Sequence, residues 1–141
     1  MSEGDVFSGG CACGAVRYQC RADPIIATFC QCRACQWDSG GGHSSHLGVA
    51  ADAVTVTGEV RFWETIAKSG AVTRRGFCPT CGSPMLLTST GMAGVIFLTA
   101  GSLDDPAVFR PSMVVFASEA PAWDAIDPSL PRFAGMPPSR T

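Results

Sequence analysis

Seven of the eight cysteines in this sequence of 141 residues fall into three short clusters. The clusters are Cys11-Ala12-Cys13, Cys30-Gln31-Cys32-Arg33-Ala34-Cys35 and Cys78-Pro79-Thr80-Cys81. Thiolates at such spacings are typical ligands of zinc, and a structural zinc site is closed by four protein ligands. Two of the clusters supply two thiolates each, whereas the middle cluster supplies three. We therefore expect two zinc ions, one closed and one with an open position.

The run Cys78-Pro79-Thr80-Cys81-Gly82 has the form of a tight turn around one metal. Proline fixes the first bend, and the glycine tolerates the positive φ that lets backbone N–H groups face the sulfurs. A disulfide or redox pair is the competing interpretation, but no βαβ pattern surrounds the two cysteines. Joined to Cys11 and Cys13, the turn completes a site of four thiolates. We interpret this zinc as structural and expect its removal to unfold the domain.

The middle cluster predicts a different kind of site. One loop can deliver Cys30, Cys32 and Cys35, which leaves the fourth tetrahedral position for water or substrate, as in catalytic zinc sites. Three thiolates around Zn²⁺ give a net charge of about minus one, so this centre is a poor Lewis acid. A soft site of this kind favours sulfur as the fourth ligand. We hypothesise that it holds a small thiol as its thiolate.

Three residues are alternative fourth ligands that would close this second site. Cys20 is in phase with Val16 and Tyr18 in an alternating stretch, so we expect it in the core. His43 and His46 are the only histidines and lie beside Gly40-Gly41-Gly42. Either histidine can be a ligand or a proton shuttle, although an exposed loop position without a catalytic part is the favoured interpretation.

Three further side chains are candidates for the wall of a pocket for an anionic thiol. They are Arg33, Trp37 and Arg75. Each can equally be a solvated or packing side chain, so the sequence assigns them no catalytic role.

The elements that must position the cysteines are predicted to be strands. Short runs rich in β-branched and aromatic residues are separated by glycines, prolines and polar clusters. They span Ala15–Cys20, Ile25–Phe29, Val54–Val56, Val60–Trp63, Val72–Phe77, Met85–Leu87, Val95–Thr99 and Met113–Phe116. Only Cys32–Asp38 is expected to form a short helical turn. The sequence thus predicts an all-β, mainly antiparallel fold with little helix.

Length and charge restrict the remaining possibilities. We expect one zinc-binding domain over residues 1–136 and a flexible tail over 137–141. A net charge of −2 without a basic run disfavours nucleic acid and anionic membranes as partners. The N-terminus lacks the features of a signal peptide, and no apolar segment is long enough to span a bilayer. We expect a cytoplasmic protein, where clustered cysteines more often bind metal than form disulfides.

Three stretches together resemble the glutathione-dependent formaldehyde-activating enzyme family, which includes relatives of centromere protein V. They are Gly9–Tyr18, the Cys30–Cys35 cluster and Arg75–Pro84, and the later runs Gly101–Pro106 and Pro121–Trp123 look like the family's C-terminal half. The resemblance implies a β-tent fold, a structural zinc on Cys11, Cys13, Cys78 and Cys81, and a second zinc on Cys30, Cys32 and Cys35 open to the sulfur of glutathione. Gln31 and Gln36-Trp37-Asp38 depart from the histidine and basic residues that are common in the family.

Two functional hypotheses follow. The first is a carbon–sulfur lyase-like enzyme that binds glutathione or a similar thiol at the open zinc and catalyses reversible adduct formation with formaldehyde or another aldehyde. The general acid that this reaction needs is not identified by the sequence. The second is a non-catalytic zinc module of the same fold, whose second metal is closed and whose surface binds another protein.

Overall fold

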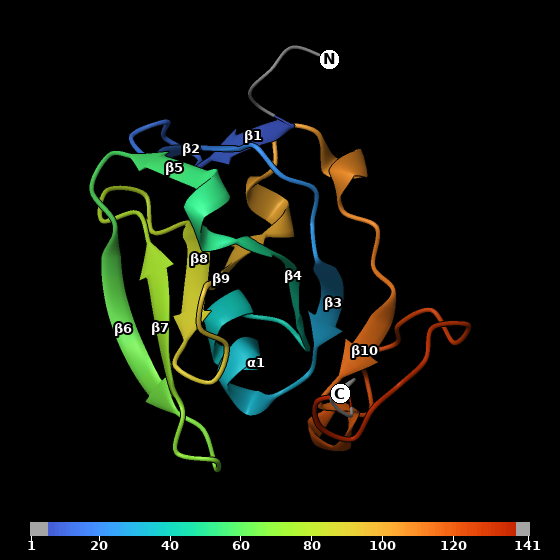
Figure 1. The fold of residues 1–141 in the computed structure, drawn as a ribbon. Coiled ribbons are helices and arrows are strands. Elements are labelled where there is room, and N and C mark those ends of the chain that lie inside the picture. Colours follow the sequence, from blue (N-terminus) through green and yellow to red (C-terminus); the bar gives the residue numbers. More distant parts are fainter. Residues whose placement is uncertain (1–5, 138–141) are drawn as a thin grey trace.

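The structure is a computed structural model that describes residues 6–137, and it consists mainly of strands (Figure 1). The strands are β1 (Phe7–Gly10), β2 (Arg17–Cys20), β3 (Ile26–Cys30), β4 (Ser44–Ala50), β5 (Val54–Thr57), β6 (Arg61–Ile66), β7 (Val72–Phe77), β8 (Pro84–Ser89), β9 (Val95–Thr99) and β10 (Met113–Val115). One α-helix, α1 (Arg33–Ser39), and four short 3₁₀ turns complete the described residues. The predicted mainly antiparallel β fold with little helix is confirmed. Most of the predicted tail, 138–141, lies outside the described residues.

The strands form two sheets. The smaller has the order β1-β2-β5, and the larger has the order β10-β3-β4-β9-β8-β7-β6. Within the described residues, neighbouring strands of both sheets pair antiparallel except β10 with β3, which is parallel. In Figure 1 the smaller sheet lies across the top of the molecule, and α1 lies at the bottom, in front of the strands of the larger sheet. Within the described residues, no helix has the length and apolarity needed to cross a membrane.

The hydrophobic core joins the two sheets. Leu98 of β9 lies opposite both Leu47 of β4 and Leu86 of β8, so these three side chains share one face of the larger sheet. They pack with Val16 and Tyr18 in one buried cluster. Cys20 belongs to the same cluster and is fully buried, which confirms the predicted in-phase set. The side chains on the opposite face of β4 therefore face α1.

Two strands of the structure were not predicted from the sequence, β1 and β4. The second omission is the larger one, because β4 is a central strand, paired with β3 on one side and β9 on the other. One face of β4 carries Ser44, His46 and Gly48, and this polar face is buried. Sequence patterns identify strands by one apolar face and one exposed polar face, so a buried polar face removes the signal.

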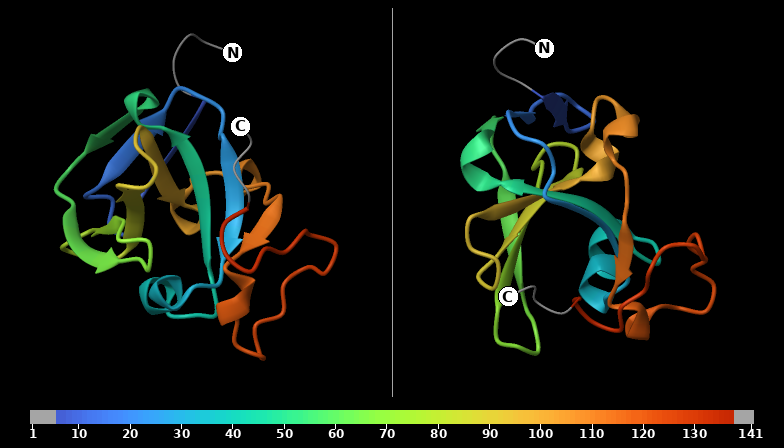
Figure 2. Two further views of the ribbon diagram at one scale, coloured as in Figure 1. Left: turned by 60° about the horizontal axis from the view of Figure 1, so that its bottom comes forward. Right: turned by 45° about the vertical axis from the view of Figure 1, so that its right-hand side comes forward.

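The last described segment returns to the start of α1. The backbone N–H of Gln31 donates to the carbonyl of Val115 at 3.0 Å, and the backbone N–H of Arg33 donates to the Glu119 carboxylate at 3.1 Å. Figure 2 shows the orange and red end of the chain beside β3 and α1. This segment contains 3₁₀ turns as well as β10. Its contacts are with the loop that carries the middle cysteines.

The close approach of β1 to β2 gives a test of this packing. A Cβ atom at Gly9 would lie 2.2 Å from the Tyr18 hydroxyl and 2.4 Å from the backbone carbonyl of Ser102. We expect Gly9→Ala to lower the free energy of unfolding by about 1–3 kcal/mol, because the backbone must move to admit the methyl group. The control is Gly135→Ala, since a Cβ at Gly135 meets nothing within 4 Å. Equal urea midpoints for the two variants would contradict the packing described here.

Candidate metal centres and the adjoining cavity

The sulfurs of the four-cysteine cluster, Cys11, Cys13, Cys78 and Cys81, all lie within 4.8 Å of one another. The Cys11–Cys13 sulfur distance is 3.6 Å, and the Cys13–Cys78 distance is 3.7 Å. Zinc bonded to four sulfurs at ~2.3 Å has tetrahedral edges of about 3.8 Å. The cluster therefore fits a tetrahedral zinc ion and can hold one.

Backbone and hydroxyl donors surround this cluster. The backbone N–H of Val16 donates to the Cys11 sulfur at 3.2 Å, and that of Thr80 donates to the Cys78 sulfur at 3.4 Å. Gly82 has φ of 78°, as predicted for the end of the turn. A hydrogen bond with Ser83 lowers the pKa of Cys81 to about 5, so this sulfur is ready to bind a metal as thiolate. These donors offset the charge that four thiolates bring together.

The three-cysteine cluster, Cys30, Cys32 and Cys35, is built where β3 passes into α1. Cys30 ends β3, and the Cys32 sulfur caps the helix by accepting the backbone N–H of Cys35 at 3.3 Å. The three sulfurs lie within 4.8 Å of one another, so this cluster can also hold zinc. Gly40 ends the helix in the left-handed conformation, with φ of 75°. A helix of two turns thus fixes the spacing of the cluster.

A fourth ligand is not supplied by residues 6–137. No further His, Cys, Asp or Glu side chain in that range joins the three-cysteine cluster at ligand distance. Cys20, one of the predicted alternatives, lies in the core between the sheets and donates to the carbonyl of Ala22. Neither His43 nor His46 belongs to the cluster. The open position expected from the sequence is therefore compatible with this arrangement.

Arg75 of β7 is a buried cation that contacts the three-cysteine cluster. Its Nη1 donates to the Cys35 sulfur at 3.6 Å and to the Asp38 carboxylate at 3.1 Å, and the residue is only 4% exposed. Hydrogen bonds with Cys30 and Cys32 hold the pKa of Cys35 far below its ordinary value, and the charge of Arg75 acts in the same direction. Arg75 therefore stabilises negative charge on this sulfur.

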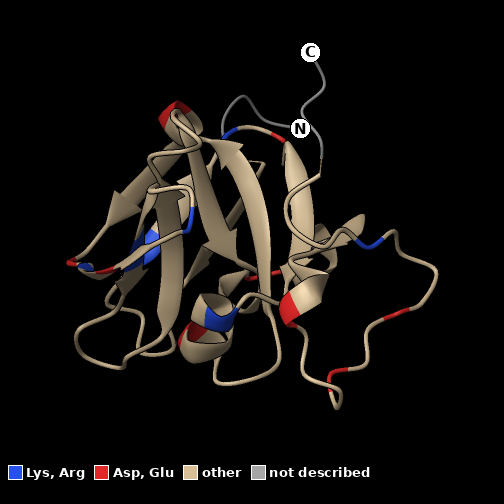
Figure 3. Cartoon of the chain, turned by 90° about the horizontal axis from the view of Figure 1, so that it is seen from below, with Lys and Arg blue, Asp and Glu red and all other residues tan. Residues whose placement is uncertain are grey.

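The predicted pocket residues lie elsewhere. Trp37 is 73% exposed on α1, and the Arg33 guanidinium lies over its ring at 5.5 Å from the centroid. Figure 3 shows that α1 carries both basic and acidic residues. None of Arg33, Trp37 and Arg75 lines the main cavity, so their expected place in a pocket wall is not supported. The sequence contains no signal that tells whether a long polar side chain lines a pocket, is buried elsewhere or is solvated.

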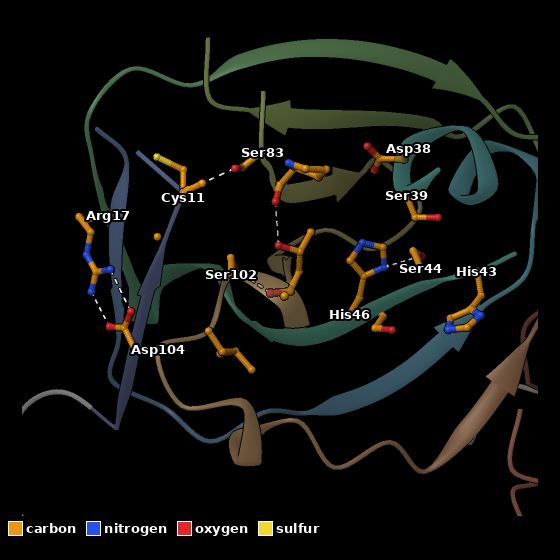
Figure 4. A pocket seen from close by; sticks show the side chains of 17 residues that line it. Cys11, Arg17, Asp38, Ser39, His43, Ser44, His46, Ser83, Ser102 and Asp104 are labelled. Atoms are coloured by element: carbon orange, nitrogen blue, oxygen red, sulfur yellow. Dashed lines mark hydrogen bonds and ion pairs between the residues drawn. The ribbon is translucent and has the colours of Figure 1, made fainter. Parts of the chain in front are cut away.

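The main cavity has a volume of about 500 Å³ and extends from the four-cysteine cluster to the end of α1 (Figure 4). Cys11 lines one end, and Asp38 and Ser39 from the last turn of α1 line the other. Most of the remaining wall is polar, with both histidines and the hydroxyls of Ser44, Ser45, Ser83, Thr99 and Ser102. A small polar molecule fits this space better than an apolar one.

Neither histidine is fully exposed, although both were expected in an exposed loop. His43 is partly buried, and its Nδ1 lies 2.9 Å from the Asp124 carboxylate. That carboxylate also accepts the Gln31 side-chain N–H at 2.9 Å. His46 lies on β4 and is 4% exposed, so its expected loop position was wrong. Asp124 was not singled out in the sequence, because nothing local shows which distant loop an isolated carboxylate contacts.

Metal content tests the two ligand sets. We predict that Cys81→Ala lowers the zinc content per chain and unfolds the domain, because the four-cysteine cluster joins the start of the fold to the β7–β8 turn. Cys20→Ala is the matched control, and it should keep both ions because Cys20 lies in the core. Elemental analysis with circular dichroism checks both results. Loss of zinc in Cys20→Ala would instead make that residue a ligand.

The Asp124 carboxylate gives a second test. We predict that Asp124→Ala lowers the free energy of unfolding by about 1–3 kcal/mol, because the buried Gln31 amide loses its acceptor. Asp23→Ala, at an exposed carboxylate, should change it by less than about 0.5 kcal/mol. Chemical denaturation of the zinc-loaded variants checks this difference, and equal stabilities would show that Asp124 does not anchor the loop.

The comparisons with known proteins agree with this architecture. A family model described as glutathione-dependent formaldehyde-activating enzyme matches residues 6–119. The crystal structure of a Rhodobacter sphaeroides protein, a structural genomics target, superposes with a TM-score of 0.57 and covers 89% of this chain and 98% of that chain. At 14% identity this likeness concerns the fold alone. No curated protein matches the sequence. The family match spans most of the chain, which therefore belongs to the glutathione-dependent formaldehyde-activating enzyme family.

Proposed function

We propose that this protein is a zinc-dependent carbon–sulfur lyase-type enzyme. Its substrates are a small thiol, glutathione or a similar one, and formaldehyde or another aldehyde, which combine reversibly. The observation that carries the proposal is the three-cysteine cluster, which has no fourth ligand from residues 6–137. Family membership supports formaldehyde activation as the reaction type. The four-cysteine cluster is proposed to hold a second, structural zinc.

The donor set favours sulfur as the substrate atom. Zinc bound by Cys30, Cys32 and Cys35 would hold an incoming thiol as its thiolate, since soft ligands prefer soft partners. Arg75 keeps its positive charge beside Cys35, which offsets part of the negative charge of four sulfurs. Asp38 holds this guanidinium in place from the last turn of α1. These residues position a nucleophilic sulfur without neutralising it.

The reaction forms and breaks one carbon–sulfur bond. In the forward direction the sulfur attacks the carbonyl carbon, and the pair of the C=O π bond moves to oxygen. Holding sulfur and carbonyl together in one site removes the entropy cost of their encounter. The cavity beside α1 is the space from which an aldehyde can approach. The cytoplasm suits this chemistry, because the clustered cysteines must stay reduced.

The competing proposal is a non-catalytic module that binds another protein. The exposed apolar side chains Phe62, Trp63 and Ile66 on β6 favour it, because large exposed apolar residues mark interaction surfaces. This proposal requires a second metal that does not respond to small thiols. The two candidates therefore differ at one observable, the ligand field of that metal.

Cobalt substitution and exchange kinetics test the enzyme. We predict that glutathione changes the ligand-field bands of the cobalt-loaded protein. We also predict that the zinc protein accelerates exchange between glutathione plus formaldehyde and their adduct, measured by NMR exchange spectroscopy. Cys35→Ala should abolish both effects while keeping a folded chain with one zinc, because the four-cysteine cluster is intact.

The matched control is Cys20→Ala, which removes a sulfur outside both clusters and should retain both effects. An unchanged cobalt spectrum in the wild-type protein would favour the binding module. Full activity in Cys35→Ala would remove the three-cysteine cluster from the reaction.

A further inference from the structure

His46 carries a polar atom that the fold leaves unused. The residue is 4% exposed, and its Nδ1 lies 3.0 Å from the Ser44 hydroxyl. Its other ring nitrogen, Nε2, is buried and has no hydrogen-bond partner within residues 6–137. A buried polar atom without a hydrogen bond destabilises the folded state. The cost is removed when a molecule in the cavity supplies the missing hydrogen bond.

The surroundings of His46 fix its ring. On β4 the residue lies opposite Thr28 of β3 and Thr99 of β9, so strands cover it on both sides. Its ring meets Phe97 edge to face, with the centroids 6.3 Å apart. In Figure 4 one ring nitrogen is joined to Ser44 and the other points away from it. Nε2 is therefore held in one direction rather than free to find a partner elsewhere.

His46 also lines the cavity and lies within reach of the charge of the three-cysteine cluster. It forms part of the cavity wall near Asp38 and Ser39. It is close enough to Cys35 for their charges to interact, and Arg75 and Asp38 act on it as well. With Nδ1 paired to Ser44, the ring has one nitrogen, Nε2, that no group of residues 6–137 engages.

From this geometry we infer that Nε2 of His46 binds the oxygen of the thiol–aldehyde adduct and carries the proton that the reaction transfers. The inference rests on the proposed function and adds the proton donor that the reaction requires. Nε2 accepts the proton released by the thiol. The sulfur then forms its bond to carbon, the C=O π pair becomes an alkoxide lone pair, and Nε2–H gives its proton to that oxygen. The imidazole is neutral before and after.

Ser44 completes this arrangement as a positioning residue. When Nδ1–H donates to the Ser44 oxygen, Nε2 is the acceptor in the neutral ring. The same hydrogen bond stabilises the transient imidazolium, in which both nitrogens donate. The cavity hydroxyl of Thr99 is already used, because it donates to the carbonyl of Pro84. Of Ser44, Thr99 and His46, His46 is therefore the residue with a side-chain atom, Nε2, that still lacks a hydrogen bond.

Two substitutions separate oxygen binding from proton transfer. His46→Asn keeps an amide near Nδ1 and removes the group at Nε2, whereas His46→Gln places an amide near Nε2 that cannot carry a proton. We expect the adduct exchange rate to fall roughly 100-fold in both zinc-loaded variants, the low end of the range for general acid–base catalysis. Adduct affinity should fall about tenfold in His46→Asn, as expected for one lost hydrogen bond, and stay near wild type in His46→Gln.

Histidine NMR supplies a readout that does not depend on activity. In the ¹⁵N-labelled zinc protein, the Nε2 resonance of His46 should shift when glutathione alone is added, because Nε2 takes up the thiol proton, and should shift again when formaldehyde is added with it. His43 is the only other histidine, and its Nδ1 is paired with Asp124. Wild-type exchange rates in both variants, or an unmoved Nε2 resonance, would overturn the inference.

The cobalt experiment distinguishes a failure of the proposed function from a failure of the role of His46. Glutathione should still change the spectrum of cobalt-loaded His46→Asn, because the thiol site does not include His46. If that change occurs and the exchange rates stay at wild type, thiol binding stands and the role of His46 fails. If glutathione leaves the wild-type cobalt spectrum unchanged, the proposed function fails, and the role of His46 fails with it.

Discussion

Thiolates that lie less than 4 Å apart repel one another, so the two cysteine clusters are the parts of this fold that most need compensating positive charge. In the four-cysteine cluster the Cys11 and Cys13 sulfurs lie 3.6 Å apart, and the Cys13 and Cys78 sulfurs lie 3.7 Å apart. The cluster joins the turn after β1 to the turn between β7 and β8, so it connects the two sheets. The buried core between the sheets includes Cys11 and Cys78 of this cluster. A zinc ion held by its four sulfurs would tie the two sheets together at this corner.

At the three-cysteine cluster the compensation is partial and comes from the protein. Arg75 donates to Cys35 from a buried position, while Asp38 neutralises part of the same guanidinium. Gln31 and Gln36 stand where the family commonly has histidine and basic residues, and both are buried. Their amides donate to Asp124 and to the Gln31 and Glu119 carbonyls, so they hold the loop rather than offer charge to a substrate. The proposed substrate therefore has fewer basic side chains to bind beside the cluster than the family commonly offers.

The parts predictable from sequence are those that local chemistry decides. Cysteine spacing identified the clusters, and alternation along Val16, Tyr18 and Cys20 identified a buried strand face. The polar face of β4 was not predictable in this way, because its burial depends on α1 and on the strands at either side. His46 was therefore expected in an exposed loop, although it is among the most buried polar residues. Asp124 and Arg75 act through partners that lie 93 and 40 positions away, distances that no local pattern encodes.

The parallel pairing of β10 with β3 has a consequence for the order of assembly. All four ligands of the four-cysteine cluster have been synthesised once residue 81 leaves the ribosome. The loop of the three-cysteine cluster, by contrast, needs Val115 and Asp124 to hold its backbone and its Gln31 side chain. During translation the first cluster can therefore take up metal while the second still lacks its supports. The nascent chain can thus complete the four-cysteine cluster before the three-cysteine cluster.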